Sequence, residues 1–229
     1  MNVAPTRDAL LRLRQETATI LPSLLMCDFG NLEREIERLE AAGVRALHLD
    51  VMDGHFVPNL TYGMPIVAAI RRLTALPIDV HLMITDPQQY ITQFVDAGSD
   101  LITVHAETGN VERSVEMIRR QGVGVGVAVN PATALREVAG ILPSCDLLLT
   151  MSVDAGFGGQ SFNPVALEKL QTAKQTWPHL MLQVDGGINL STIQQCYVAG
   201  ARLFVVGSAI FGKEDYQQAI SELAGAIGR

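Results

Sequence analysis

The chain has 229 residues, of which 48% are hydrophobic, 18% charged and 5% aromatic, and its formal net charge is −7. Because the 17 basic residues are spread among 24 acidic ones, no basic cluster indicates a nucleic-acid partner. No apolar run reaches the roughly 18 residues of a membrane span, and Asp8 and Glu16 argue against a secretory signal. We expect a cytoplasmic globular protein that binds neither nucleic acid nor membranes.

Lysine and cysteine usage excludes two kinds of chemistry. The three lysines all lie in segments predicted as helix or loop surface: Lys169, Lys174 and Lys213. None follows a predicted strand, so Schiff-base catalysis has no candidate. The three cysteines lack metal-binding spacing and predict reduced thiols in or near the core: Cys27, Cys145 and Cys196.

Short apolar runs recur along the chain and predict eight strands. Their centres fall near residues 21, 48, 80, 103, 126, 148, 183 and 205. Eight helical patterns follow the strands, for example 31–42, with Asn31 as its N-cap, and 114–121. Ahead of the first strand, residues 6–15 predict either a short helix or a disordered tail.

A glycine joins several of these helices to the next strand. Three joins are nearly superimposable and begin with Ala-Gly, at Gly43, Gly98 and Gly200. Glycine after a helix adopts the left-handed conformation without a Cβ penalty. The residue seven positions further along falls at the far end of each strand: Asp50, His105 and Gly207.

Continuously apolar strands are typical of a parallel sheet that is buried on both faces. Eight strand–helix units in succession predict an α/β protein with a (β/α)8 TIM barrel in one domain, 1–229, of which 1–16 form an N-terminal extension. The extension would close the bottom of the barrel if it is helical. The longest connections after strands are 53–63 and 152–163, and active sites of this architecture lie on such loops.

Polar side chains alternate along the second and third strands. Residues two apart share a face, so His48 and Asp50 point the same way, as do Asp79 and His81. Asp185 ends the seventh strand, and with His48, Asp50 and His81 it offers two carboxylates and two imidazoles for Zn²⁺, Fe²⁺ or Mn²⁺. The alternative is a hydrogen-bonded polar layer without a metal. Three methionines at the same end predict an apolar wall or core filling: Met52, Met83 and Met151.

The remaining histidines carry weaker signals. His105 is expected to support a metal ligand or to hydrogen-bond the backbone. His55 lies on a loop, where it would be solvated or would face a substrate, and His179 is predicted at the surface.

Glycines cluster after the last three strands. Backbone amides there predict a phosphate site, together with a short helix at 208–211, whereas a lone Gly-Gly pair would indicate only a turn. Backbone dipoles also allow an acidic protein to bind an anion. The residues concerned are Gly156, Phe157, Gly158, Gly159, Gly186, Gly187, Gly207 and Ser208.

Six runs of sequence carry a specific resemblance. They are 49–59 (LDVMDGHFVPN), 79–83 (DVHLM), 130–133 (NPAT), 156–162 (GFGGQSF), 184–187 (VDGG) and 207–211 (GSAIF). Together they resemble the ribulose-phosphate 3-epimerase family, in the family's order and over nearly the whole chain from about residue 20. The resemblance implies a barrel of the ribulose-phosphate-binding type that interconverts D-ribulose 5-phosphate and D-xylulose 5-phosphate.

The same resemblance implies roles for individual residues. One divalent ion, Zn²⁺ or Fe²⁺ first and Mn²⁺ or Co²⁺ next, would be held by His48, Asp50, His81 and Asp185. Asp50 would accept and Asp185 would donate the C3 proton through an enediolate. Ser23 and His81 would contact the substrate, and the protein would form a homo-oligomer.

Two departures from the family pattern stand out. Residues 26–29 read MCDF where the family commonly has SADF, and Asp154-Ala155 replaces Asn-Pro before the glycine loop. The lost proline predicts a less preorganised loop. Two alternatives remain: a sister epimerase acting on a longer sugar such as allulose 6-phosphate, and a barrel that only binds. The second would require broken metal ligands, and all four are present.

Overall fold

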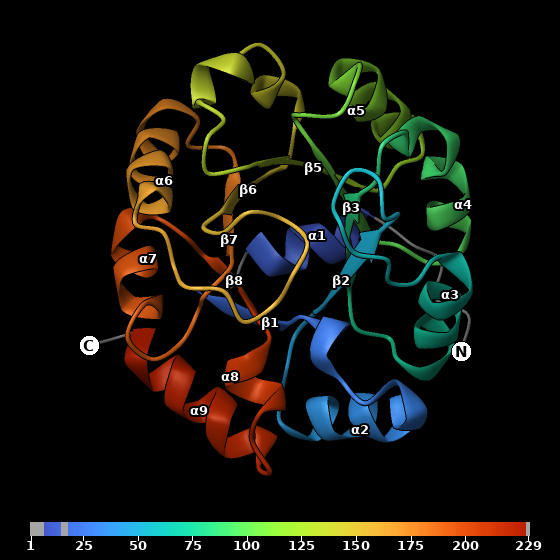
Figure 1. Ribbon diagram of the computed structural model, residues 1–229, viewed down its shortest axis with the longest axis vertical. Coiled ribbons are helices and arrows are strands. Elements are labelled where there is room, and N and C mark those ends of the chain that lie inside the picture. The colour runs from blue at the N-terminus through green and yellow to red at the C-terminus, as the bar shows by residue number, and fades with distance from the viewer. Residues whose placement is uncertain (1–6, 15–17, 228–229) are drawn as a thin grey trace.

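The computed structural model describes residues 7–14 and 18–227 and has eight parallel strands in one sheet, as predicted (Figure 1). The strands are β1 (Thr19–Pro22), β2 (Leu47–Met52), β3 (Ile78–Met83), β4 (Leu101–His105), β5 (Gly124–Val129), β6 (Leu147–Met151), β7 (Met181–Asp185) and β8 (Leu203–Val206). β1 pairs with β8, and a bridge between Ser23 and His48 links its end to β2. The sheet therefore forms a nearly closed barrel, which confirms the predicted fold class.

Helices surround the strands in an outer ring (Figure 1). They are α2 (Leu32–Ala41), α3 (Met64–Leu73), α4 (Ile91–Asp96), α5 (Val111–Arg120), α6 (Val165–Thr176), α7 (Ile193–Ala199), α8 (Ser208–Phe211) and α9 (Tyr216–Ile227). The helix predicted between β5 and β6 is wrong, because that connection has only two short 3-10 helices, Leu135–Glu137 and Leu142–Ser144. Gly140 and Pro143 interrupt the segment, and both disfavour a longer helix.

The N-terminal segment closes the barrel bottom. α1 (Arg7–Arg14) places Leu13 in the apolar cluster that fills the barrel interior with Leu21 and Leu203. A guanidinium nitrogen of Arg14 also donates to the carbonyl of Asp146 at 3.3 Å. Residues 7–14 are therefore helical rather than a disordered tail. The remaining residues of the predicted extension, 1–6 and 15–16, lie outside the described residues.

Local sequence signals account for several element boundaries. The three Ala-Gly joins adopt positive φ at Gly43 (80°), Gly98 (112°) and Gly200 (127°), as predicted. Asn31 occupies the N-cap position of α2, but its amide donates to the Asp28 carboxylate at 2.7 Å instead of capping the helix. Asp28 caps the preceding turn, because it accepts from the Gly30 N–H.

The predictions for the cysteines and for Lys169 have different outcomes. The cysteines are free and buried, as expected. Lys169 is not a surface residue: it is buried, since its ammonium reaches two backbone carbonyls after β5. Among the described residues, no helix has the length and apolar character needed to cross a membrane.

Candidate active site

The candidate site lies at the carboxyl ends of the strands, and the strand register assembles it. Asp50 of β2 pairs with His81 of β3, and Met151 of β6 pairs with Asp185 of β7. Because alternate residues of a barrel strand face the same side, His48 and Asp50 point into the barrel together. Four predicted ligands thus converge from three strands.

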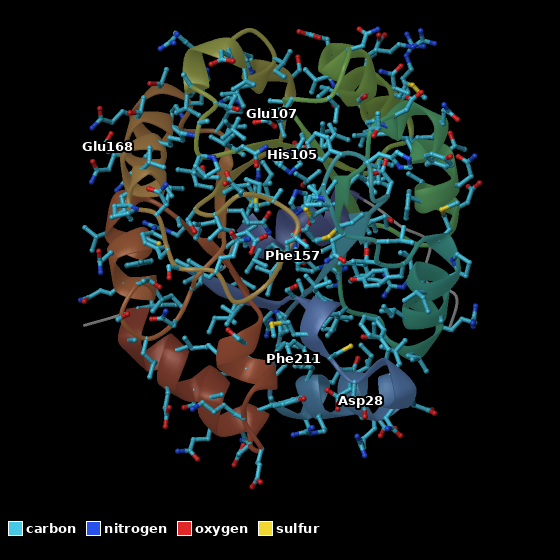
Figure 2. The ribbon with its side chains drawn as sticks, viewed as in Figure 1. Asp28, His105, Glu107, Phe157, Glu168 and Phe211 are labelled. Atoms are coloured by element: carbon cyan, nitrogen blue, oxygen red, sulfur yellow. The ribbon has the colours of Figure 1, made fainter. Side chains whose placement is uncertain are left out.

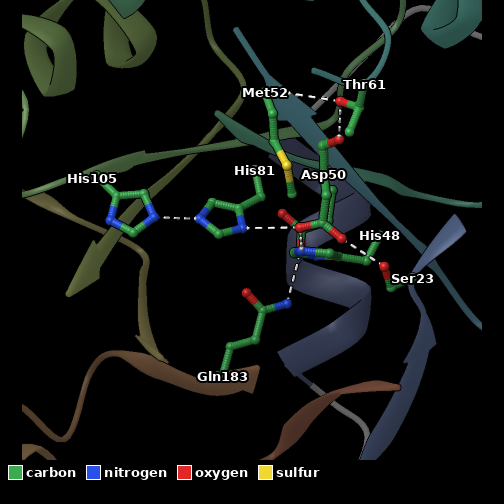
Figure 3. A network of polar contacts seen from close by, with 9 residues as sticks. Ser23, His48, Asp50, Met52, Thr61, His81, His105 and Gln183 are labelled. Atoms are coloured by element: carbon green, nitrogen blue, oxygen red, sulfur yellow. Dashed lines mark hydrogen bonds and ion pairs between the residues drawn. The ribbon is translucent and has the colours of Figure 1, made fainter. Parts of the chain in front are cut away.

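Asp50 is the centre of this group (Figure 3). Its Oδ1 lies 3.2 Å from His48 Nε2 and 3.1 Å from His81 Nδ1, and its Oδ2 accepts from the Ser23 hydroxyl at 2.6 Å. Four side chains offer one ligand atom each, and those atoms all lie within 4.8 Å of one another: His48, Asp50, His81 and Asp185.

Each of the two histidine ligands also makes a contact through its other ring nitrogen. His48 Nδ1 lies 2.8 Å from the Asp79 carboxylate, which accepts from the Gln183 amide at 2.6 Å. His81 Nε2 lies 2.9 Å from His105 Nε2. His105 thus supports a predicted metal ligand, the first of its two expected roles, and its Nδ1 is bonded to Glu107 at 2.9 Å rather than to the backbone.

Burial and charge set the pKa values of these groups. Burial would raise the pKa of Asp50, but His48 and His81 hold it well below its ordinary value. For Asp185, burial and then the negative charge of Asp50 raise the pKa to about 7. Burial lowers the pKa of His105 to about 4, so that ring is neutral near pH 7. The site therefore contains one firmly ionised carboxyl and one that exchanges a proton near neutrality.

The donor set fits a divalent cation. Two imidazoles and two carboxylates match the ligands of Zn²⁺ and Fe²⁺ in proteins. Two carboxylates this close, one buried and one half-buried, repel each other, and a bound cation would balance their charge. The histidines also have the supporting hydrogen bonds that metal-ligating imidazoles usually make.

A cavity of about 280 Å³ opens above these side chains. Its lining includes the predicted acid and base, Ser23, the methionine wall and the glycine clusters: Ser23, Asp50, Met52, Met83, Met151, Gly156, Phe157, Gly158, Gly159, Asp185, Gly186, Gly187, Gly207 and Ser208. His48 and His81 are fully buried and do not line it. The contact of His81 with substrate therefore stays a prediction.

The glycine loops at the cavity have conformations or contacts that exclude larger residues. Gly186 and Gly187 have φ of 107° and 61°, and a Cβ at Gly187 would lie 2.6 Å from the backbone nitrogen of Phe162. The β6 and β7 loops therefore pack backbone against backbone at this end of the cavity. Phe157, over the centre of the barrel mouth in Figure 2, is 53% exposed.

Sequence reasoning missed several residues of the site. Gln160, Phe162 and Asn189 line the cavity beside the predicted loops. Gln183 and Glu107 each lie two residues from a predicted side chain on the same strand or its extension, so the period-two spacing could have indicated them. His55 is exposed and bonded to the Asp53 carbonyl, and His179 is exposed as predicted.

Comparison with known proteins matches this arrangement. The profile of the ribulose-phosphate 3 epimerase family matches residues 19–211. The chain is 44% identical over 213 residues to ribulose-phosphate 3-epimerase of Bacillus subtilis (strain 168), covering 90% of this chain and 98% of that protein. The chain belongs to the ribulose-phosphate 3-epimerase family. It is therefore an isomerase, and its family is metal-dependent.

Other epimerases and barrels extend this comparison. The ribulose-phosphate 3-epimerase of Escherichia coli (strain K12) is 39% identical over 217 residues, covering 92% of this chain and 96% of that protein. The structure of 3-hexulose-6-phosphate synthase from Salmonella typhimurium matches with a TM-score of 0.70 at 18% identity, covering 91% of this chain and 98% of that one. A mutant tryptophan synthase alpha-subunit from Pyrococcus furiosus also matches with a TM-score of 0.70 at 17% identity, covering 90% of this chain and 98% of that one. These two structures support the fold alone.

Proposed function

We propose that this epimerase interconverts D-ribulose 5-phosphate and D-xylulose 5-phosphate by moving a proton at C3 between two aspartates. One observation carries the proposal: Asp50 and Asp185, from strands separated by β1 and β8, both line the same cavity. Inversion at C3 requires a proton to leave one face and another to arrive at the opposite face. Two carboxyl groups on different strands meet that requirement.

The different environments of the two carboxyls suggest their roles. Asp50, which is held ionised by His48 and His81, accepts the C3 proton and leaves an enediolate. Asp185, whose pKa is raised to about 7, holds a proton that it donates from the other side. In the reverse direction the two residues exchange roles. Ser23 donates to Asp50 Oδ2 and keeps this carboxylate in one orientation.

We assign the metal centre to His48, Asp50, His81 and Asp185, with Zn²⁺ or Fe²⁺ as the preferred ion and Mn²⁺ or Co²⁺ as alternatives. A divalent ion there supplies Lewis-acid stabilisation of negative charge on the substrate oxygens. The four side chains would hold the ion, while the methionine wall of Met52, Met83 and Met151 would limit access of water.

The phosphate of the substrate is proposed to bind at the glycine loops after β6, β7 and β8. Gly186, Gly187 and Gly207 expose backbone at one end of the cavity, and α8 begins directly after Gly207. Backbone N–H groups can bind a dianion in a protein of net charge −7. Asp154, at the start of the β6 loop, would weaken phosphate binding if its carboxylate turned inward.

Homo-oligomer formation and a cytoplasmic location are also proposed. Leu60 and Val198 are 73% and 68% exposed, and such apolar side chains are often covered in an oligomer.

Solvent isotope exchange tests the two-aspartate reaction. In deuterated water, the protein should convert ribulose 5-phosphate to xylulose 5-phosphate carrying deuterium at C3, because the proton added comes from a group that exchanges with solvent. Mass spectrometry and NMR of the product measure the label. Product without deuterium would contradict the mechanism, and equal turnover of allulose 6-phosphate would contradict the five-carbon preference.

Metal binding should depend on pH. Because the pKa of Asp185 is raised to about 7, the carboxyl is neutral below that pH and is a weaker ligand for a cation. The apparent affinity for Zn²⁺ should therefore rise with pH through this range; although burial opposes them, Asp50 and Asp79 also raise the pKa of His48, so that loss of its proton adds to the rise. Calorimetry in buffers of different ionisation enthalpy counts the released protons. Equal affinity at pH 6 and pH 8 would show that Asp185 is not a ligand.

A further inference from the structure

The Asn-Pro-Ala-Thr turn after β5 and the buried Lys169 have no role in the proposed reaction. None of these residues lines the active-site cavity. The Lys169 ammonium donates to the carbonyls of Asn130 and Pro131, at 2.6 and 2.9 Å. A buried ammonium thus fixes the backbone of the turn from the α6 side.

The same turn binds the carboxylate of Glu107. Glu107 Oε1 accepts from the backbone N–H of Asn130 at 2.8 Å and from the Thr133 hydroxyl. Glu107 Oε2 faces His105 Nδ1 at 2.9 Å, and Figure 2 places these two side chains next to each other. Because an ionised carboxylate only accepts hydrogen bonds, Nδ1 of His105 must carry a proton.

The proton on His105 Nδ1 determines which nitrogen of His81 carries a proton. His105 is fully buried, and an uncharged ring with its proton on Nδ1 offers Nε2 as an acceptor. The Nε2 atoms of His105 and His81 lie 2.9 Å apart, so one of them must donate. His81 Nε2 is then the donor, and Nδ1, which lies 3.1 Å from Asp50 on the side of the other ligands, is the nitrogen left for the metal.

We propose that Glu107 and His105 are positioning residues that fix the tautomer of His81, so that Nδ1 is the atom presented to the metal. The Asn130–Thr133 turn and Lys169 anchor Glu107 for this task. The inference rests on the proposed metal centre and adds to it a second group of residues behind the ligands. It also gives the NPAT motif a function away from the substrate.

The substitution Glu107→Gln tests the tautomer directly. The backbone N–H of Asn130 can only donate, so it keeps the amide oxygen of the new side chain. The amide nitrogen then faces His105 Nδ1, which must accept. The tautomers of both rings reverse, and His81 Nδ1 gains a proton that competes with the metal.

We expect Zn²⁺ affinity of Glu107→Gln to fall about 10- to 100-fold, as for other changes behind a metal ligand. Competition with a fluorescent chelator measures this affinity at fixed pH. Glu137→Gln is the matched control, because Glu137 is exposed in the connection between β5 and β6, accepts from the Ala134 N–H and does not contact His105. Its affinity should stay within twofold of the unsubstituted chain.

The ring nitrogens supply a readout that a merely structural role would not change. In the Zn²⁺-loaded unsubstituted chain, ¹⁵N NMR should show His105 protonated at Nδ1 and His81 protonated at Nε2, whatever the stability of the variant. A proton on His105 Nε2, or unchanged affinity in Glu107→Gln, would overturn the inference alone. Absence of Zn²⁺ binding by the unsubstituted chain would overturn the metal centre and this inference together.

Discussion

Asp185→Asn is expected to lower kcat for epimerisation by about 10³-fold, within the range of about 10²–10⁴ for losing a positioned acid or base. The amide keeps the shape of the side chain but has no proton acidic enough to be donated to C3. Asp50 remains ionised in this variant, because His48 and His81 still hold its pKa low. The variant should therefore still exchange the C3 proton of ribulose 5-phosphate with deuterated water, without forming xylulose 5-phosphate.

This combination of exchange without inversion separates the loss of one base from a general loss of the site. Asp185 is also a proposed metal ligand, so turnover must be measured at Zn²⁺ concentrations that saturate the variant. Asp215→Asn is the control: Asp215 is exposed, caps α9 through the Gln218 N–H, and asparagine keeps that capping. Inversion at an unchanged rate in Asp185→Asn would show that another group is the acid.

The part of the site that could be predicted from sequence depends on local periodicity. His48 and Asp50 lie two residues apart in a β-strand, so their common face follows from backbone geometry alone. The barrel then brings them to Asp185, because carboxyl ends of parallel strands meet at one end. The cavity lining includes the predicted acid, base and glycine loops for this reason.

Features that depend on a partner far along the chain could not be predicted in the same way. Lys169 has the neighbours of a surface helix residue in the sequence, and only the docking of α6 beside the β5 turn buries it. Asn31 has the right residue type for a cap, yet its side-chain amide donates to Asp28 and its oxygen accepts no N–H from the helix. A propensity describes what a residue can do, and tertiary contacts decide among the options.

The join at Gly98 has one feature that the local sequence predicts and one that depends on a residue far along the chain. The sequence predicts a left-handed glycine there, and the structure adds that a Cβ would lie 2.4 Å from Cγ of Arg71. Arg71 uses this space to reach Asp100 at 2.8 Å and the carbonyls of Thr74 and Leu76 at 2.6 and 2.8 Å. One buried guanidinium thus ties the end of α3 to the start of β3 and β4.

Arg71→Met should lower the free energy of unfolding by about 3–5 kcal/mol, because it removes the guanidinium that pairs with the buried carboxylate of Asp100. Urea denaturation followed by circular dichroism measures this change. Arg120→Met is the control, because it makes the same substitution at an exposed ion pair. The side chains of Arg120 and Glu116 are 75% and 61% exposed, and such a pair contributes about 0.3–0.5 kcal/mol.

The double variant Arg71→Met with Asp100→Asn decides whether charge is the cause. If the cost comes from the lost charge pairing with Arg71, neutralising Asp100 should recover part of the stability lost in Arg71→Met. Asparagine can still accept from the Ile78 N–H, which Asp100 bonds at 2.9 Å. Losses that simply add in the double variant would instead assign the effect to packing and to the carbonyls of Thr74 and Leu76. In that case Gly98 would be required for the volume of the arginine stem rather than for its charge.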